Sequence, residues 1–71
     1  MKYLVVVEKG ASGFGAFVPD LPGCIAAAET ESEVLELIRE AIEFHIEGLK
    51  AHGEPVPGPA SRSEVVEIEA A

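Results

Sequence analysis

The chain has 71 residues, of which 48% are hydrophobic and 25% charged, with one cysteine and a formal net charge of −8. This length predicts a single domain, residues 1–71, that buries only about 60% of its unfolded surface and gains stability from association with another chain. The negative charge argues against direct contact with nucleic acid and favours a basic partner. One cysteine also excludes an internal disulfide.

No segment of the sequence has the composition of a targeting or membrane segment. The apolar run from Tyr3 to Val7 is too short for a secretory signal, and no small-residue cleavage site follows it. No stretch approaches the roughly 18 apolar residues of a membrane span. We therefore expect a cytoplasmic protein without membrane contact, in agreement with its lone free thiol.

Three short strands are predicted in the first 28 residues. Tyr3 to Glu8 is β-branched and apolar, and the glycine-bearing loop 9–13 leads it into a returning strand from Phe14 to Val18. Asp20 to Gly23 has the composition of a turn. A third strand is predicted after this turn, from Cys24 to Ala28.

A long helix is predicted next. Thr30 and Glu33 have the spacing of a capping box, which predicts that the helix begins at Glu31. Apolar side chains then recur at three- and four-residue steps, as is typical of an amphipathic helix. Gly53 can adopt the left-handed cap conformation and is followed by prolines, so the helix is expected to end near His52.

The last part of the chain is predicted to be extended. Residues 54–62 are rich in proline, and Glu64 to Glu69 resume a strand-like alternation. The whole order is therefore β-β-β-α-β. It predicts an α+β fold, with a three-stranded antiparallel sheet, one long amphipathic helix on one of its faces, and a short final strand.

The residue types that carry catalysis are few. Cys24 has the chemistry of a nucleophile, with His45 or His52 as its base, but a structural cysteine is the favoured interpretation. The two histidines lie two turns apart along the helix, too far to share a metal ion. Carboxylates such as Glu8 and Asp20 leave a small metal-dependent hydrolase or nuclease as an alternative. We predict no enzymatic activity, no cofactor and no metal site.

Two surfaces are candidates for contact with a protein partner. The first is a row of helix carboxylates spaced four, three and four residues apart: Glu36, Glu40, Glu43 and Glu47. Like charges at i,i+4 destabilise a helix by about 0.2–0.5 kcal/mol per pair, and a basic partner relieves that cost; the alternative is a solvated face. The second is the turn Asp20-Leu21-Pro22-Gly23-Cys24, in which Leu21 is either an exposed apolar knob or a core residue.

The order of motifs resembles the HicB-like antitoxins of bacterial and archaeal toxin–antitoxin pairs. The resemblance covers nearly the whole chain and is carried by Gly13 to Cys24, by Thr30 with Glu33, by Glu40-Ala41, and by Gly53 to Pro57. It implies a partial ribonuclease-H-like fold that docks on a small basic HicA-like toxin, an RNA-cleaving protein, and covers its active site. It also implies self-association. The 48% hydrophobic content, on a chain too short to bury it all, predicts a homodimer or a higher oligomer.

The resemblance leads to one predicted function and one alternative of a different class. We predict an antitoxin-like domain that neutralises a small basic RNA-cleaving toxin by direct contact. Many members of the family continue into a DNA-binding domain, which is not found in residues 1–71, so autorepression by this chain alone is not expected. The alternative is a stand-alone oligomeric domain that has no toxin.

Overall fold

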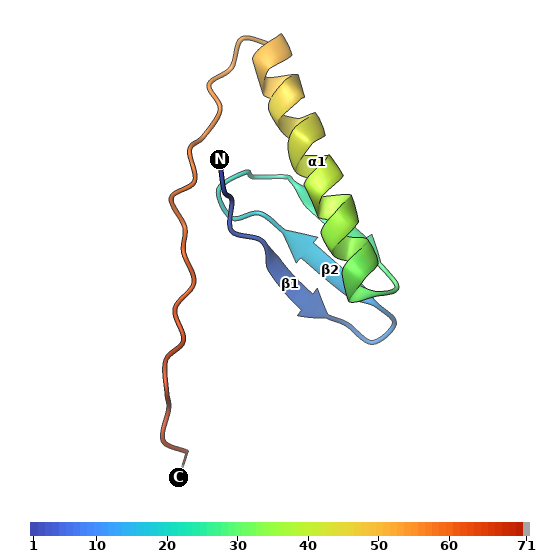
Figure 1. Cartoon of the computed structure of the whole chain (residues 1–71), viewed down its shortest axis with the longest axis vertical. Helices are drawn as coiled ribbons and strands as arrows, with labels where there is room; N and C mark the ends of the chain where they lie inside the picture. Colours follow the sequence, from blue (N-terminus) through green and yellow to red (C-terminus); the bar gives the residue numbers. More distant parts are fainter. Residues whose placement is uncertain (71) are drawn as a thin grey trace.

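The computed structural model describes residues 1–70 and contains three strands followed by one helix. The strands β1 (Val6–Lys9), β2 (Phe14–Phe17) and β3 (Ile25–Ala28) form an antiparallel sheet in the order β1-β2-β3. The helix α1 (Glu31–Ala51) crosses one face of this sheet and packs on β2 and β3 (Figure 1). The predicted α+β class and the order of the first four elements are confirmed.

The sheet separates an inner from an outer face by simple alternation. Ala16 and Val18 point toward α1 and are buried, whereas Phe17, between them in the chain, is 36% exposed on the opposite face. The loop before β2 runs so close to the end of β3 that a Cβ on Gly13 would lie 2.6 Å from the carbonyl oxygen of Ala28. Only a glycine fits at this position without a shift of the backbone.

Both ends of α1 have the predicted capping residues. Thr30 Oγ1 accepts a hydrogen bond from the Glu33 amide (3.2 Å) and donates one to Glu33 Oε1 (2.8 Å). At the other end Gly53 has a positive φ of 69°, its amide donates to the Lys50 carbonyl, and the next amide donates to the Leu49 carbonyl. Although α1 is 21 residues long, no helix in the described part of the chain is apolar enough to cross a membrane.

The core of the protein is small. Its buried residues come from β2, the loop after it and the first half of α1: Ala16, Val18, Leu21, Cys24, Val34 and Ile38. Half-buried side chains surround them, among them Tyr3, Val5 and Val7 from the N-terminal segment. Many large apolar residues remain outside this core, so the 48% hydrophobic content is not accounted for by burial within one copy.

The predicted final strand at Glu64 to Glu69 is wrong for the single chain. Residues 54–70 form an extended tail that pairs with no strand, and only Val56 is even half-buried (Figure 1). An alternating segment becomes a strand only where a sheet edge accepts its N–H and C=O groups, and the tail meets no such edge in the described structure. The tail instead makes the longest dimension of the molecule 52 Å.

Candidate functional site

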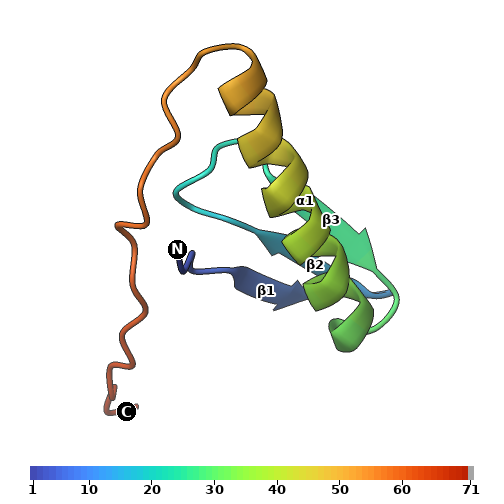
Figure 2. The same ribbon diagram turned by 45° about the horizontal axis from the view of Figure 1, so that its top comes forward.

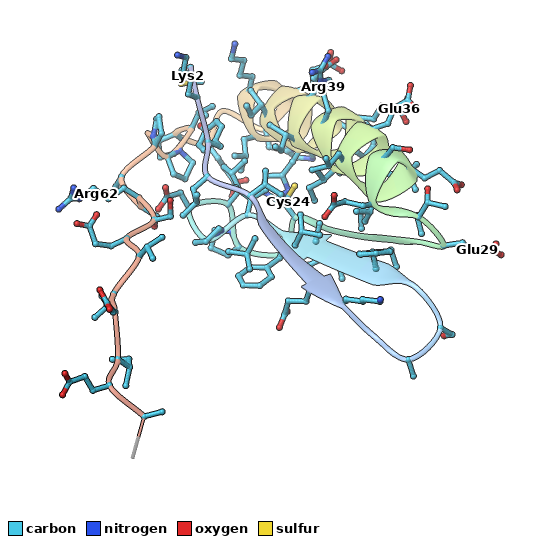
Figure 3. All side chains as sticks on the ribbon, turned by 60° about the horizontal axis from the view of Figure 1, so that its bottom comes forward. Lys2, Cys24, Glu29, Glu36, Arg39 and Arg62 are labelled. Atoms are coloured by element: carbon cyan, nitrogen blue, oxygen red, sulfur yellow. The ribbon has the colours of Figure 1, made fainter. Side chains whose placement is uncertain are left out.

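The four helix glutamates that were predicted to form a row lie together on the exposed side of α1. Glu36, Glu40, Glu43 and Glu47 are all exposed, and Figure 3 shows Glu36 projecting away from the sheet. Within residues 1–70 the one ion pair joins Arg62 and Glu64 at 3.7 Å, in the tail. The row therefore has no ion-pair partner in the described structure, and its mutual repulsion remains.

Exposed apolar side chains lie on both sides of this row: Leu35, 45% exposed, on one side, and two that the sequence did not indicate on the other. Leu37 is 43% exposed and Phe44 is 78% exposed. Being seven residues apart, they lie on the same flank of α1. A hollow of about 200 Å³ opens next to Leu37, lined also by Glu33, Glu36 and Glu40. The available signal was the position of Phe44, between Glu43 and His45 and outside the apolar stripe.

The loop Asp20 to Cys24 is not the exposed apolar knob that was one of the predictions. The Leu21 amide donates to the Val18 carbonyl and the Cys24 amide to the Leu21 carbonyl, each at 3.0 Å, which turns the loop back on itself. The side chain of Leu21 is consequently fully buried, and that of Cys24 is 3% exposed. The predicted contact between the Leu21 side chain and a toxin is therefore wrong, because this side chain belongs to the core. Pro22 and Gly23 remain exposed and stay predicted contacts.

Cys24 has the environment of a structural cysteine. Figure 3 shows it between α1 and the sheet, and burial raises the pKa of its thiol. A raised pKa favours the neutral thiol over the nucleophilic thiolate. The interpretation of Cys24 as a core residue agrees with this geometry.

Asp20 binds the tail, a role that the sequence did not indicate. Its Oδ2 accepts hydrogen bonds from the amides of Ala60 and Ser61, and its Oδ1 accepts one from Ser61 Oγ, all at 2.8 Å. These donors, the Ser61 amide first, lower the pKa of the Asp20 carboxyl group. We call this contact the tail clamp. Forty residues separate its partners, so no local pattern predicted it.

The two histidines and the remaining carboxylates do not converge. His52 is exposed, with Nδ1 at 2.8 Å from the Gly48 carbonyl oxygen of its own helix, and His45 is half-buried two turns earlier. Glu8 is exposed on β1. Among residues 1–70 no group of three His, Cys, Asp or Glu side chains is placed to hold a metal ion. The candidate site is therefore the exposed side of α1, with its acidic and apolar side chains, and not a cluster of catalytic or metal-binding groups.

The fold and this surface define a small α+β domain with features suited to binding another protein. A family model described as the HicB_like antitoxin of bacterial toxin-antitoxin system matches residues 3–70. The chain therefore belongs to the HicB-like antitoxin family, and the resemblance of its motifs is confirmed.

Curated relatives and solved structures include proteins that are similar to this chain. A UPF0150 protein of Thermoplasma acidophilum is 45% identical over 58 residues, which cover 80% of this chain and 84% of that protein. An uncharacterized 14.9 kDa protein of Haemophilus phage HP1 is 44% identical over 57 residues, and the match spans only 43% of its length. A chain in the solved HicA3 and HicB3 toxin-antitoxin complex superposes with a TM-score of 0.72 at 33% identity, covering 84% of this chain and 70% of that one.

Proposed function

We propose that this protein is an antitoxin domain that neutralises a small, basic, RNA-cleaving HicA-like toxin by direct contact. Its family supports a toxin–antitoxin role, and its solved relative comes from a complex named for HicA3 and HicB3. The observation that carries the contact surface is the unneutralised row of Glu36, Glu40, Glu43 and Glu47 beside exposed Leu37 and Phe44. We call these six residues the acidic face of α1.

The acidic face combines two kinds of contact that act at different stages of binding. Exposed carboxylates attract a basic partner from a distance and raise the rate of encounter. Phe44, at 78% exposure, offers a large apolar area whose burial slows dissociation. Lysine and arginine side chains of the toxin would also relieve the repulsion between glutamates one turn apart.

The same charge supports two further parts of the proposal. With a net charge of −8, the protein is repelled by a phosphate backbone, so it acts on the toxin and not on the toxin's RNA. We place this action in the cytoplasm, where an RNA-cleaving toxin meets its substrate.

The charge component is tested by association kinetics with a HicA-like protein from the same genome. The variant Glu40→Lys with Glu43→Lys should associate more slowly, by a factor on the order of 10 at low ionic strength. The difference should shrink as salt is added, because exposed charges are screened beyond about 10 Å at 0.1 M. The matched control is Glu8→Lys with Glu54→Lys, which changes the net charge equally at exposed positions away from the acidic face. Equal slowing by both variants would assign the effect to net charge alone.

The apolar component is tested by dissociation kinetics and by RNA cleavage. Phe44→Ala should raise the dissociation rate, by about 30-fold if the ring is a binding hot spot. It should also restore RNA cleavage by the toxin at antitoxin concentrations that suppress cleavage with the wild type. The free energy of unfolding should not change, because the ring is exposed in the free protein. Unchanged dissociation in both Phe44→Ala and Leu37→Ala would refute this surface.

A further inference from the structure

The outer edge of β1 has no partner in the described structure. The sheet order places β2 on one side of β1 and no strand on the other (Figure 1). A free edge presents a row of unpaired N–H and C=O groups that a further strand can bind. Val5 and Val7 pack toward the core, so the odd-numbered side chains here face α1 and Glu8 faces outward.

A groove opens between α1 and the segment of residues 1–5 that leads into β1. Because α1 packs on β2 and β3, it has no strand beneath its other flank (Figure 2). The groove has a volume of about 500 Å³ and is lined mainly by apolar side chains, Tyr3, Val5, Leu35, Ile38 and Ile42, with Lys2, Arg39 and Glu43 as its charged lining residues. A strand that pairs with the edge of β1 and continues beside residues 3–5 would direct every second side chain into it.

The tail carries a segment with the pattern that this groove requires. In the segment Glu64 to Glu69, Val66 and Ile68 share one face of an extended chain with Glu64 at its start. Val65, Glu67 and Glu69 share the other face. Val66 is 68% exposed and Ile68 is 77% exposed, so neither is covered in a single copy. The face with Val66 and Ile68 matches the apolar groove.

The charges of the two surfaces are complementary. The segment brings three glutamates, whereas two cations, Lys2 and Arg39, and one carboxylate, Glu43, line the groove, and Lys9 ends β1. Figure 3 shows Lys2 and Arg39 projecting on the same side of the molecule. These three are among only five Lys and Arg residues in the chain. A strand rich in glutamate therefore finds its counter-charges at this edge.

The tail clamp directs the segment away from its own groove. Asp20 holds Ala60 and Ser61, and the Tyr3 hydroxyl donates to the Pro57 carbonyl oxygen, so the base of the tail is fixed against its own chain. Beyond this point the tail runs free of the sheet (Figure 2), with Val65 fully exposed. Prolines 55, 57 and 59 stiffen the approach to the clamp.

We infer that residues 64–69 of a second copy of this chain add as a strand to the outer edge of β1 and insert Val66 and Ile68 into the groove. Reciprocal exchange of tails gives a closed two-fold dimer. In this dimer Val66 and Ile68 of each tail and the apolar side chains of each groove are buried. This dimer contact uses the flank of α1 with Leu35 and Ile42, opposite the flank with Leu37 and Phe44. Glu43 of the acidic face also lines the groove, so the two contacts share this one residue.

Two neighbouring substitutions of the same kind test which face of the segment 64–69 enters the groove. Val66→Asp should raise the dissociation constant of the dimer, measured by sedimentation equilibrium, by a factor on the order of 10 or more. Val65→Asp places the same charge on the opposite face of the segment and should have a much smaller effect. Both side chains are exposed in the single copy, so both variants should fold. A monomeric wild type at micromolar concentration, or equal losses in the two variants, would overturn the proposal.

Exchange between chains is tested with cysteines placed on separate copies. In a Cys24→Ala background, Glu8→Cys and Glu67→Cys put single thiols on the outward faces of β1 and of the added strand. Mixing the two variants, one of them carrying a mass tag, should give a disulfide-linked heterodimer under mild oxidation. Ser32→Cys, at the start of α1, mixed with Glu67→Cys is the control that should not cross-link. A disulfide that forms only when both cysteines are on one chain would show that the tail binds its own β1 and would overturn the exchange.

Discussion

Residues 3–53 and residues 54–70 contain apolar side chains of the same kinds, but only the first region buries them. Val34 and Ile38 are at most 2% exposed, whereas Val65, Val66 and Ile68 are between 68% and 100% exposed. The first region is held by packing, and the tail is held by hydrogen bonds at Asp20 and Tyr3. The apolar content of this chain is therefore divided between a packed core and side chains that stay exposed in the single copy, and it is the exposed ones that we propose for contact with other chains.

The largest expected contrast between the two regions comes from truncating apolar side chains. Leu21→Ala should lower the free energy of unfolding by about 2–5 kcal/mol, because the side chain is fully buried and leaves a cavity. Val65→Ala, at a fully exposed position, should change it by less than about 0.5 kcal/mol. Urea unfolding followed by circular dichroism measures both values. A small loss for Leu21→Ala would contradict its place in the core.

A second contrast uses glycines. Gly13→Ala should destabilise the protein by about 1–3 kcal/mol, because the new methyl group would meet the backbone of Ala28 at 2.6 Å. Gly58→Ala, in the tail, meets nothing within 4 Å and should be nearly neutral. Thermal unfolding of both variants measures the two Tm values, and a lower Tm for Gly13→Ala alone would distinguish the packed region from the tail. Equal shifts in Tm would contradict the close approach at Gly13.

The N-cap of α1 allows a smaller effect to be measured. Thr30→Ala removes the acceptor for the Glu33 amide and should cost about 1 kcal/mol of unfolding free energy. Thr30→Ser keeps the hydroxyl and should retain most of that stability. Ser63→Ala is the corresponding change in the tail, where no helix needs a cap. If Thr30→Ser lost as much as Thr30→Ala, the hydroxyl would not be the stabilising group.

The smallest expected effect is the dependence of the tail clamp on pH. Hydrogen bonds from Ser61 and Ala60 lower the pKa of Asp20 in the folded state. The clamp is therefore fully formed above the ordinary aspartate pKa of about 3.9 and is lost as pH falls through the lower folded value. The amide signals of Ala60 and Ser61 in NMR spectra should follow this transition. Asp20→Asn should abolish it, and a transition that persisted in this variant would have another cause.

The sequence predicted those parts of the fold that depend on neighbouring residues. The strands follow short, mainly apolar runs separated by glycine-bearing loops, and the ends of α1 follow from Thr30 with Glu33 and from Gly53. The final strand was wrong because the alternation of Glu64 to Glu69 reports a tendency to pair and not the presence of a partner edge. The sequence left open whether Leu21 is buried or exposed, because the composition of a turn does not determine which way its apolar side chain points.

Of the proposed contact surface, only the acidic part was predicted from the sequence. The spacing of Glu36, Glu40, Glu43 and Glu47 places them together on any helix, and the structure leaves them exposed. The contribution of Leu37 and Phe44 was missed, because their exposure depends on which flank of α1 the sheet covers. The contact between Asp20 and Ser61 depends on the three-dimensional path of the whole chain.

The binding of the toxin to the acidic face of α1 is tested most directly by NMR spectra of the antitoxin side chains during titration with the HicA-like protein. The account predicts large shifts for the Leu37 methyl groups and the Phe44 ring, and little change for Ile42 on the opposite flank. The reverse pattern, with Ile42 shifted while Leu37 and Phe44 stay unchanged at saturation, would contradict it.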